Sequence, residues 1–343
     1  MPSVVNIAAF TDRGQALAHR LAALIHANDT DTHVAVARVK NLSNYLANVF
    51  EYSNQLIFIG AIGIAVRAVA PYLKSKTSDP AVLVIDDAGC YVIPILSGHL
   101  GLANRHARRY AEMLRATPVI TTATDVNGVF AFDEFAAMAG FTVYNPPVIK
   151  HIASAMLHGI EVGLYSELTV TGSLPPLVNR QTGGPMGVVI SMDPTLKPFV
   201  KTLNLVPKCL HVGIGTRRDV PPEQLLQLLE ECLHDLDIPA AALAAIATIE
   251  LKRDEPAIVE LARHYRVPLN VYSADELNNV ADRFSQSDFV QATTGTANVC
   301  EAAAFLSSRQ GQLIRAKQAQ NGMTLAIALE DRSVRFDIIE KGA

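Results

Sequence analysis

The feature that most constrains the fold is a regular alternation of apolar strand, glycine turn and helix between residues 55 and 134. The strand segments are continuous apolar runs, without the polar residues that alternate along a half-exposed strand. Such runs are typical of parallel sheets that helices cover on both faces. We therefore predict an open α/β sheet here, with most of the candidate chemistry at its turns.

The same pattern begins at the N-terminus and returns near the C-terminus. Residues 4–10 predict a strand and residues 12–27 a helix, and residues 209–214 open a second run of strands spaced by helices. The many prolines between these two runs are typical of loops. The predicted fold class is α/β, with two open, mostly parallel lobes joined by a small loop-rich middle segment. The predicted domains are residues 1–139, 140–207 and 208–343.

Three strand predictions bear on the site or on the sheet order. Residues 118–122 predict the last strand of the first lobe. Residues 289–294 predict a strand of the third lobe, and residues 325–329 predict the strand that closes its sheet.

Composition excludes several classes of function. A net charge of −4 and a pI near 6.2 argue against a general binder of nucleic acid or of anionic membranes, which needs a basic surface. The N-terminus lacks a signal-peptide pattern, and the most apolar stretch, residues 239–249, is shorter than the roughly 20 residues that span a bilayer. The four cysteines are far apart, which suggests neither a zinc site nor a disulfide framework. We expect a reducing cytoplasm.

A glycine turn, Gly60 to Gly63, lies between a predicted strand and a predicted helix. Free amides at the start of a helix can hold a carboxylate or phosphate, and Arg67 follows one turn later. The spacing matches neither a P-loop nor a dinucleotide fingerprint. By itself the motif favours a tight turn beside an exposed arginine.

The sequence Ser97-Gly98-His99 precedes a predicted helix. A histidine exchanges protons near neutral pH and a serine donates hydrogen bonds, so His99 is the best candidate base by position. The alternative is that Ser97 caps the helix and that His99 lies on the surface.

A polar run from Thr121 to Gly128 follows the predicted strand 118–122, at the edge where open α/β sheets bind ligands. An Asx turn that leads into a helix is the alternative. Asp79 and Asp86 flank another predicted strand and stay open as an acid or base, whereas Asp87 fits a hairpin turn.

In the third lobe, residues 213–218 imitate a dinucleotide fingerprint but carry Arg218 where the third glycine belongs, which argues against NAD. Arg217 and Arg218 lie beside a predicted helix start and could instead grip carboxylates.

Several motifs together carry a resemblance to a known family. GAIGIAVRAVAP, KTSDPAVLVIDDAG, LSGHLGLAN and PVITTATDVNG strongly resemble the N-terminal region of the cobalt-precorrin-5A hydrolase family of anaerobic cobalamin biosynthesis. The third lobe is similar through VGIGTRRD, AIATIELKRDEP, VPLNVYSADEL and TTGTANVCEAAA. The chain departs from the family pattern at Thr216, where cysteine or serine is usual, and at residues 294–297. The resemblance is weak across the middle segment.

The resemblance implies hydrolysis of a carbon–carbon bond. Water opens the lactone of a cobalt-bound tetrapyrrole, and a two-carbon unit leaves as acetaldehyde. On that basis we hypothesise that His99 or Asp125 activates the water. The remaining expected contacts are oxygen stabilisation by Gly60, Gly63 and Arg67, and substrate binding by Ser97, Thr121, Thr122 and Asn127.

We further expect Arg217, Arg218 and Lys252 to clamp peripheral carboxylates from the opposite lobe. Because the cobalt enters inside the substrate, no protein-bound metal and no organic cofactor are expected. The expected partners are the substrate and neighbouring enzymes of the cobalamin pathway. The alternative function is a non-catalytic carrier of a cobalt corrinoid intermediate, and the fallback is a generic anion-binding α/β protein. Acetaldehyde release separates the hydrolase from both.

Overall fold

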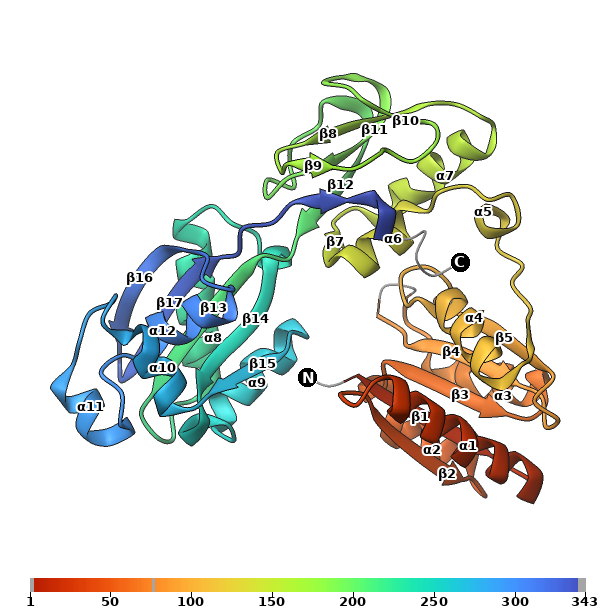
Figure 1. The fold of residues 1–343 in the computed structure, drawn as a ribbon, viewed down its shortest axis with the longest axis horizontal. Coiled ribbons are helices and arrows are strands. Elements are labelled where there is room, and N and C mark those ends of the chain that lie inside the picture. Colours follow the sequence, from red (N-terminus) through yellow and green to blue (C-terminus); the bar gives the residue numbers. More distant parts are fainter. Residues whose placement is uncertain (1–2, 76–77, 339–343) are drawn as a thin grey trace.

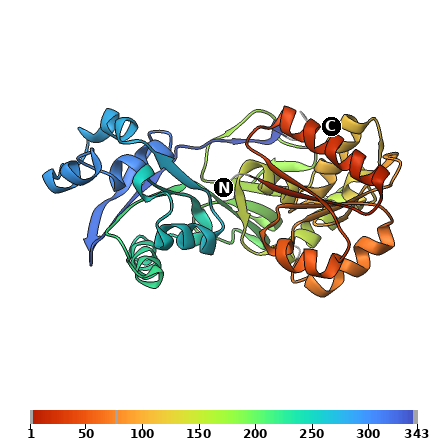
Figure 2. The same cartoon turned by 90° about the horizontal axis from the view of Figure 1, so that it is seen from below.

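The computed structural model describes residues 3–75 and 78–338, and it builds them on three large sheets (Figure 1). The strands of these sheets fall within residues 4–118, 141–207 and 210–329. The units built on them are termed the first, middle and third domains. Figure 2 shows the first and third domains toward opposite ends of the molecule.

The first domain is a six-stranded sheet with helices on both faces (Figure 2). Its strands are β1 (Val4–Ala9), β2 (His33–Arg38), β3 (Gln55–Ile59), β4 (Ala81–Ile85), β5 (Tyr91–Leu96) and β6 (Thr117–Pro118). Its helices are α1 (Asp12–Asn28), α2 (Leu42–Val49), α3 (Ile62–Val69) and α4 (Ala103–Leu114). Leu21 of α1 and Tyr110 of α4 lie in the core on one face, and Leu46 of α2 and Ala65 of α3 lie in the core on the other. Burial on both sides explains why β3 and β4 are continuously apolar.

One reversal in this sheet decides where its turns lie. In the order β2-β1-β3-β4-β5-β6, the first four strands are parallel, β5 is antiparallel to β4, and β6 is parallel to β5. The end of β5 therefore lies beside the start of β4, with Leu96 opposite Val82. The end of β3 lies beside the end of β4, with Ile59 opposite Ile85. The length of β4, roughly 13 Å at about 3.3 Å per residue, separates the two edges.

The last strand of the first sheet is shorter than predicted. β6 spans Thr117–Pro118, and the amide of Val119 makes one further hydrogen bond to the carbonyl of Val92. The chain then leaves the sheet and forms the short helix α5 (Ala123–Val126). The polar run therefore lies on α5 and the turns around it, beyond the sheet edge.

The middle domain contains a five-stranded sheet that the sequence pattern does not predict. Its strands are β7 (Phe141–Val143), β8 (Val162–Ser166), β10 (Val178–Arg180), β11 (Gly184–Ile190) and β12 (Phe199–Pro207), in the order β10-β8-β11-β12-β7. Its helices are α6 (Phe132–Ala139) and α7 (Ile149–Leu157). Phe132 and Phe135 of α6 pack with Ile152 and Leu203 in the core of this domain. By packing, α6 therefore belongs to the middle domain, although the predicted boundary places it in the first.

The third domain is a five-stranded sheet with the order β15-β14-β13-β17-β16. Its strands are β13 (Leu210–Thr216), β14 (Leu243–Ile249), β15 (Leu269–Tyr272), β16 (Gln312–Gln320) and β17 (Met323–Leu329). Its helices are α8 (Pro222–Asp235), α9 (Pro256–Tyr265), α10 (Ala274–Ala281), α11 (Asp288–Thr294) and α12 (Cys300–Ser307).

One strand prediction for this domain is wrong, and a second is right about the strand but wrong about its place in the sheet. Residues 289–294 are helical in α11, because the side chain of Ser287 accepts a hydrogen bond from the amide of Val290 and caps the helix. Residues 325–329 lie inside the sheet, between β13 and the polar edge strand β16.

The C-terminal segment, residues 330–338, returns from the third domain to the middle domain (Figure 1). Its strand β18 (Val334–Arg335) pairs in parallel with β9 (Val170–Thr171). The ring of Phe336 stacks on that of Phe135, with centroids 4.5 Å apart. The guanidinium of Arg332 donates hydrogen bonds to the carbonyls of Ala139, Gly140 and Lys208. The segment therefore completes the middle domain, although the predicted boundary assigns it to the third.

Short 3-10 helices occupy Phe50–Tyr52, Ala70–Tyr72, Pro146–Val148, Ala240–Ala242, Glu250–Lys252 and Phe336–Ile338. Within residues 3–75 and 78–338, every helix is too short or too polar to cross a membrane.

Candidate active site

His99 follows β5 on a tight turn. Ser97 adopts a left-handed backbone with φ 56°, and its hydroxyl donates to the carbonyl oxygen of Asp79 at 3.1 Å. A Cβ on Gly98 would come 2.9 Å from Oδ1 of Asn104, so the turn packs tightly against the start of α4. Ser97 is thus a turn residue, and its hydroxyl is already bonded to the backbone.

Both ring nitrogens of His99 are bonded to carboxylates. Nε2 lies 2.8 Å from Oδ2 of Asp125 on α5, and Nδ1 lies 3.2 Å from Oδ1 of Asp133 on α6. The three side chains are 12%, 7% and 11% exposed, so water screens the pairs little. Burial by itself lowers the pKa of His99, but the two carboxylates outweigh burial and raise the pKa to about 10. His99 is therefore an imidazolium at neutral pH.

Asp125 has partners on both oxygens. Oδ1 accepts from Nη2 of Arg108 at 2.5 Å, and Oδ2 also accepts from Nδ2 of Asn104 at 3.0 Å. Burial by itself raises the pKa of Asp125, but hydrogen bonds from His99 and Arg108 lower it to about 2. Asp125 is therefore a fixed anion that holds His99 in place.

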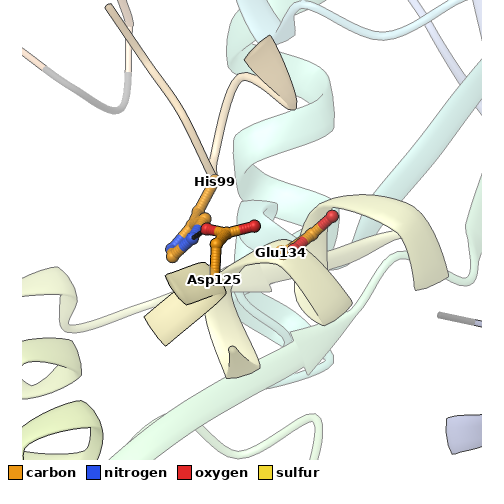
Figure 3. A group of neighbouring side chains, drawn as sticks. All are labelled: His99, Asp125 and Glu134. Carbon is orange, nitrogen blue, oxygen red and sulfur yellow. Dashed lines mark hydrogen bonds and ion pairs between the residues drawn. The ribbon is translucent and has the colours of Figure 1, made fainter. Parts of the chain in front are cut away.

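A third carboxylate, that of Glu134 on α6, lies beside this pair (Figure 3). Glu134 is 8% exposed, and its carboxylate accepts no hydrogen bond from the residues that the structure describes. Burial raises its pKa. One side-chain nitrogen or oxygen from each of His99, Asp125 and Glu134 lies within 4.8 Å of the other two, and these three residues could hold a metal ion.

A cavity of about 330 Å³ opens beside His99, at the junction of the first and middle domains. The first domain contributes His99, and α5 with its preceding turn contributes Thr122 and Thr124. The middle-domain side of the wall includes Phe130, Phe132, Asp133, Ile149, Lys150, Ser154, Leu157 and Leu203. The volume lies at the lower end of the range for ligand pockets, so the cavity has room for part of a macrocycle. Three polar side chains, those of His99, Asp133 and Lys150, thus lie in a largely apolar cavity wall.

The structure brings together three of the predicted residues, namely His99, Asp125 and Thr122. The hydroxyl of Thr122 accepts from Nδ2 of Asn104 at 2.9 Å, and the same amide also reaches Asp125. Thr121 is exposed beside Thr122. Asn127 donates to the carbonyl of Ala123 at 2.8 Å and so closes α5, which gives its side chain a structural role.

The glycine turn of Gly60 and Gly63, with Arg67, lies at the other edge of the first sheet. Gly60 follows the end of β3, whereas His99 follows the end of the antiparallel strand β5. The amide of Gly60 is also occupied, since it donates to the carbonyl of Ile85 at 2.8 Å. The turn and Arg67 therefore lie away from His99, and their role in stabilising oxygen charge stays a prediction.

The predicted clamp residues lie in the third domain and do not line the cavity beside His99. Lys252 forms an ion pair with Glu255 at 2.6 Å, and both side chains are largely buried. Arg217 and Arg218 are exposed after the end of β13, and Arg217 packs so closely on Gly322 that a Cβ there would come 2.0 Å from its Nε. A role for these residues as a clamp on substrate carboxylates stays a prediction.

Four site residues escape the sequence analysis, namely Asn104, Arg108, Asp133 and Glu134. The first two occupy one face of α4 at a spacing of four residues and directly follow the His99 turn, which is the signal that could have found them. Asp133 and Glu134 lie in the first turn of α6, where acidic residues favour the helix dipole. Because this common helix position explains both residues, the sequence gives no sign that they lie near His99.

The two aspartates left open by the sequence analysis are turn residues. Asp79 accepts the amides of Lys74 and Ser75. Asp86 accepts those of Ala88, Cys90 and Tyr91 and closes the β4–β5 hairpin.

A sheet covered by helices and a buried histidine between carboxylates at a cavity define an α/β protein with an acid–base site. Residues 44–125 match the family described as cobalamin synthesis G N-terminal, and residues 210–328 match cobalamin synthesis G C-terminus. The chain is 35% identical over 345 residues to the cobalt-precorrin-5A hydrolase of Salmonella typhimurium (strain LT2), which covers 96% of this chain and 98% of that protein. It therefore belongs to the cobalt-precorrin-5A hydrolase family, as its motifs predict.

A further relative supports this placement in sequence and in length, and a solved structure aligns with most of the chain. The cobalt-precorrin-5A hydrolase of Priestia megaterium is 33% identical over 302 residues, which cover 83% of this chain and 80% of that protein. A crystal structure of a cobalamin biosynthesis protein G homologue from Sulfolobus solfataricus aligns over 96% of this chain and 97% of that one, with 24% identity and a TM-score of 0.45. His99 and Asp125 lie inside the matched N-terminal region, whereas Asp133 and Glu134 follow it.

Proposed function

We propose that this chain hydrolyses cobalt-precorrin-5A in anaerobic cobalamin biosynthesis. Water opens the lactone of the cobalt-bound tetrapyrrole, and a two-carbon unit leaves as acetaldehyde to give cobalt-precorrin-5B. The observation that carries this proposal is similarity along the whole chain to a relative of that name, of which 98% is covered. The buried pair of His99 and Asp125 supports it, because hydrolysis needs placed acid and base groups.

His99 acts in this proposal as an acid. Its pKa of about 10 and that of Asp125 near 2 make both residues poor acceptors of a proton from water at neutral pH. A positive imidazolium at the cavity wall instead stabilises the oxygen charge that develops when water adds to the lactone carbonyl. Asp125 keeps the ring charged and oriented. This assignment replaces the hypothesis that either residue activates the water.

Asp133 is the carboxylate that takes the proton from water. It lines the same cavity as His99, so both groups reach one bound molecule. Its Oδ1 accepts from His99 and from the amide of Glu134 at 3.2 Å each, which leaves Oδ2 for a water in the cavity. The proton from water thus passes to Oδ2 of Asp133, while Oδ1 of the same carboxylate accepts a hydrogen bond from His99.

The rest of the cavity wall suits one edge of a carboxylate-bearing macrocycle. The apolar side chains contact the ring, the hydroxyl of Thr122 orients it, and the ammonium of Lys150 meets a peripheral carboxylate. Thr121, which is exposed beside Thr122, is a further expected contact of the macrocycle. Arg217 and Arg218 bind further carboxylates from the third domain.

We place this reaction in a reducing cytoplasm. Cys90, Cys209, Cys232 and Cys300 are all free, which supports such a compartment. Neighbouring enzymes of the cobalamin pathway are the expected donors and acceptors of the macrocycle.

An anaerobic incubation with cobalt-precorrin-5A tests the function. Acetaldehyde and the macrocycle mass are followed together over many turnovers. One acetaldehyde for each macrocycle that loses the corresponding two carbons supports the hydrolase. Tight binding without a change in mass would instead identify a carrier.

A further inference from the structure

Glu134 poses a physical problem in the cluster around His99. Its side chain is only 8% exposed, yet the described residues donate no hydrogen bond to its carboxylate. A largely buried carboxylate without a hydrogen-bond donor is unfavourable. Asp133, the preceding residue on α6, does have partners. His99 and Arg108 act on Glu134 through their charge alone, so its carboxylate is free to bind a further ligand.

The charges around His99 are those that a cation site needs. Asp125, Asp133 and Glu134 bring three carboxylates to His99, and Arg108 pairs with Asp125. A divalent cation that replaces the proton on His99 adds one positive charge to this cluster.

The geometry has the arrangement of a metal-binding histidine. Nδ1 of His99 donates to Asp133. Nε2 faces Asp125, with Glu134 beside this pair (Figure 3). A carboxylate on one ring nitrogen commonly fixes a histidine whose other nitrogen binds a metal. Ligand atoms at about 2.1 Å from a cation lie at most about 4.2 Å apart. The present spread of 4.8 Å exceeds this by little, so a small rotation of Glu134 closes the site.

We propose that Nε2 of His99, Oδ2 of Asp125 and the carboxylate of Glu134 bind a divalent first-row cation such as Zn²⁺. Imidazole and carboxylate ligands suit such ions, and the adjoining cavity leaves coordination positions open to water. This inference rests on the site of the proposed function and departs from the expectation of no protein-bound metal. The cation supplies the positive charge that the proton on His99 supplies otherwise.

Cation binding is coupled to the proton on Nε2. A cation displaces that proton, so binding releases about one proton and strengthens as the pH rises. The charged groups that face His99 are Asp125 from α5, Asp133 and Glu134 from α6, Arg108 from α4, and Lys150 from the cavity wall on α7.

The test is a titration of chelator-treated protein with Zn²⁺ by isothermal calorimetry, in two buffers with different ionisation enthalpies. All proteins carry Cys90→Ser, because Cys90 is a free, exposed thiol and thiolates are good zinc ligands. We expect one equivalent of Zn²⁺ per chain, with release of about one proton. Glu134→Gln, which keeps the shape of the side chain, weakens binding at least tenfold. Glu112→Gln, on the exposed side of α4, leaves binding unchanged.

Two results would overturn the cation site. One is the absence of stoichiometric zinc in the parent protein, and the other is equal affinity in Glu134→Gln, provided that thermal unfolding shows this variant folded. The proposed function fails separately. If the protein binds zinc as expected but releases no acetaldehyde from the substrate, the proposed hydrolase function is wrong. If it releases acetaldehyde but binds no zinc, the proposed cation site is wrong.

Discussion

At the scale of single residues, His99 and the carboxylates around it stabilise one another through ion pairs. The imidazolium donates to Asp125 and Asp133, and Arg108 and Asn104 hold Asp125 from the other side. Because little water reaches the cluster, its ion pairs are stronger than they would be at the surface. Replacing one residue of this cluster should therefore change the pKa of His99 and of Asp125.

Asp125→Asn should bring the pKa of His99 down toward its ordinary value, because it removes the carboxylate on Nε2. We expect kcat at neutral pH to fall by about 100-fold as the acid loses its proton and its orientation. The measurement is an NMR titration of His99 together with the pH profile of kcat. Asp12→Asn, on an exposed ion pair, is the control. A His99 pKa that stays near 10 in Asp125→Asn would contradict the assigned pairing.

A second histidine, His106 on α4, makes stability depend on acid pH. Burial lowers its pKa from 6.5 to about 4, and Arg109 and Arg105 add to this. Below about pH 6.5 the unfolded chain takes up a proton that the folded His106 refuses, so the free energy of unfolding should fall by about 2 kcal/mol toward pH 4. His99 has a raised pKa, so its contribution is complete in this range and is lost only as the pH rises from 6.5 toward 10.

Urea unfolding at pH 4.5 and pH 7 checks the role of His106. In His106→Gln the difference between the two pH values should shrink. An unchanged difference would assign the acid sensitivity to other groups.

At the scale of elements, the β4–β5 hairpin decides which turn reaches the cavity. The sequence places Asp87 in a hairpin turn, and the structure confirms a tight turn between β4 and β5, with Gly89 at φ 71°. Strands joined by so tight a turn are antiparallel, so the reversal of β5 was available from the sequence. Its consequence, that His99 and Arg67 lie at opposite edges, follows from the hairpin and overrules the common rule for parallel sheets.

Gly213 sets how closely α12 crosses β13. A Cβ there would come 1.8 Å from the carbonyl oxygen of Cys300, which is backbone and cannot move aside. Gly213→Ala should therefore destabilise the third domain by about 3 kcal/mol or more. Gly63→Ala is the control, because its Cβ meets only the flexible end of Arg67 at 3.5 Å, and it should be neutral or stabilising. Equal midpoints of thermal unfolding in the two variants would contradict this packing.

Other elements leave weaker signals in the sequence. Three strands of the middle domain, β7, β9 and β10, have only two or three residues, and turn residues flank them, so these segments show no periodicity. The edge strand β16 is polar because much of it faces solvent. In α11 the apolar residues Phe289 and Val290 favour a strand, and the cap from Ser287 decides for a helix.

At the scale of the molecule, the C-terminal segment joins parts of the chain that lie about 200 residues apart. Phe336 packs on Phe135, and α6 carries Asp133 and Glu134 at its start. The segment therefore supports the helix that provides two site carboxylates. No local pattern could predict this contact, because it depends on where the third domain ends in space.

Phe336→Ala should destabilise the middle domain by about 3–4 kcal/mol, because it removes a buried ring from an aromatic cluster. We also expect lower activity as α6 loosens. Phe289→Ala, which removes an exposed ring from α11, is the matched control and should change stability little. Thermal unfolding and kcat are compared for both. The account of the segment fails if the two variants are equally stable.

The measurement that tests the central claim most directly is the anaerobic rate of acetaldehyde release from cobalt-precorrin-5A by the parent protein, His99→Gln and Arg67→Ala. The account places chemistry at the end of β5 and none at the end of β3. It predicts rapid release by the parent, a kcat about 100-fold lower for His99→Gln, and a kcat/KM within about twofold of the parent for Arg67→Ala. No release by the parent, or a severe loss in Arg67→Ala with an active His99→Gln, would contradict it.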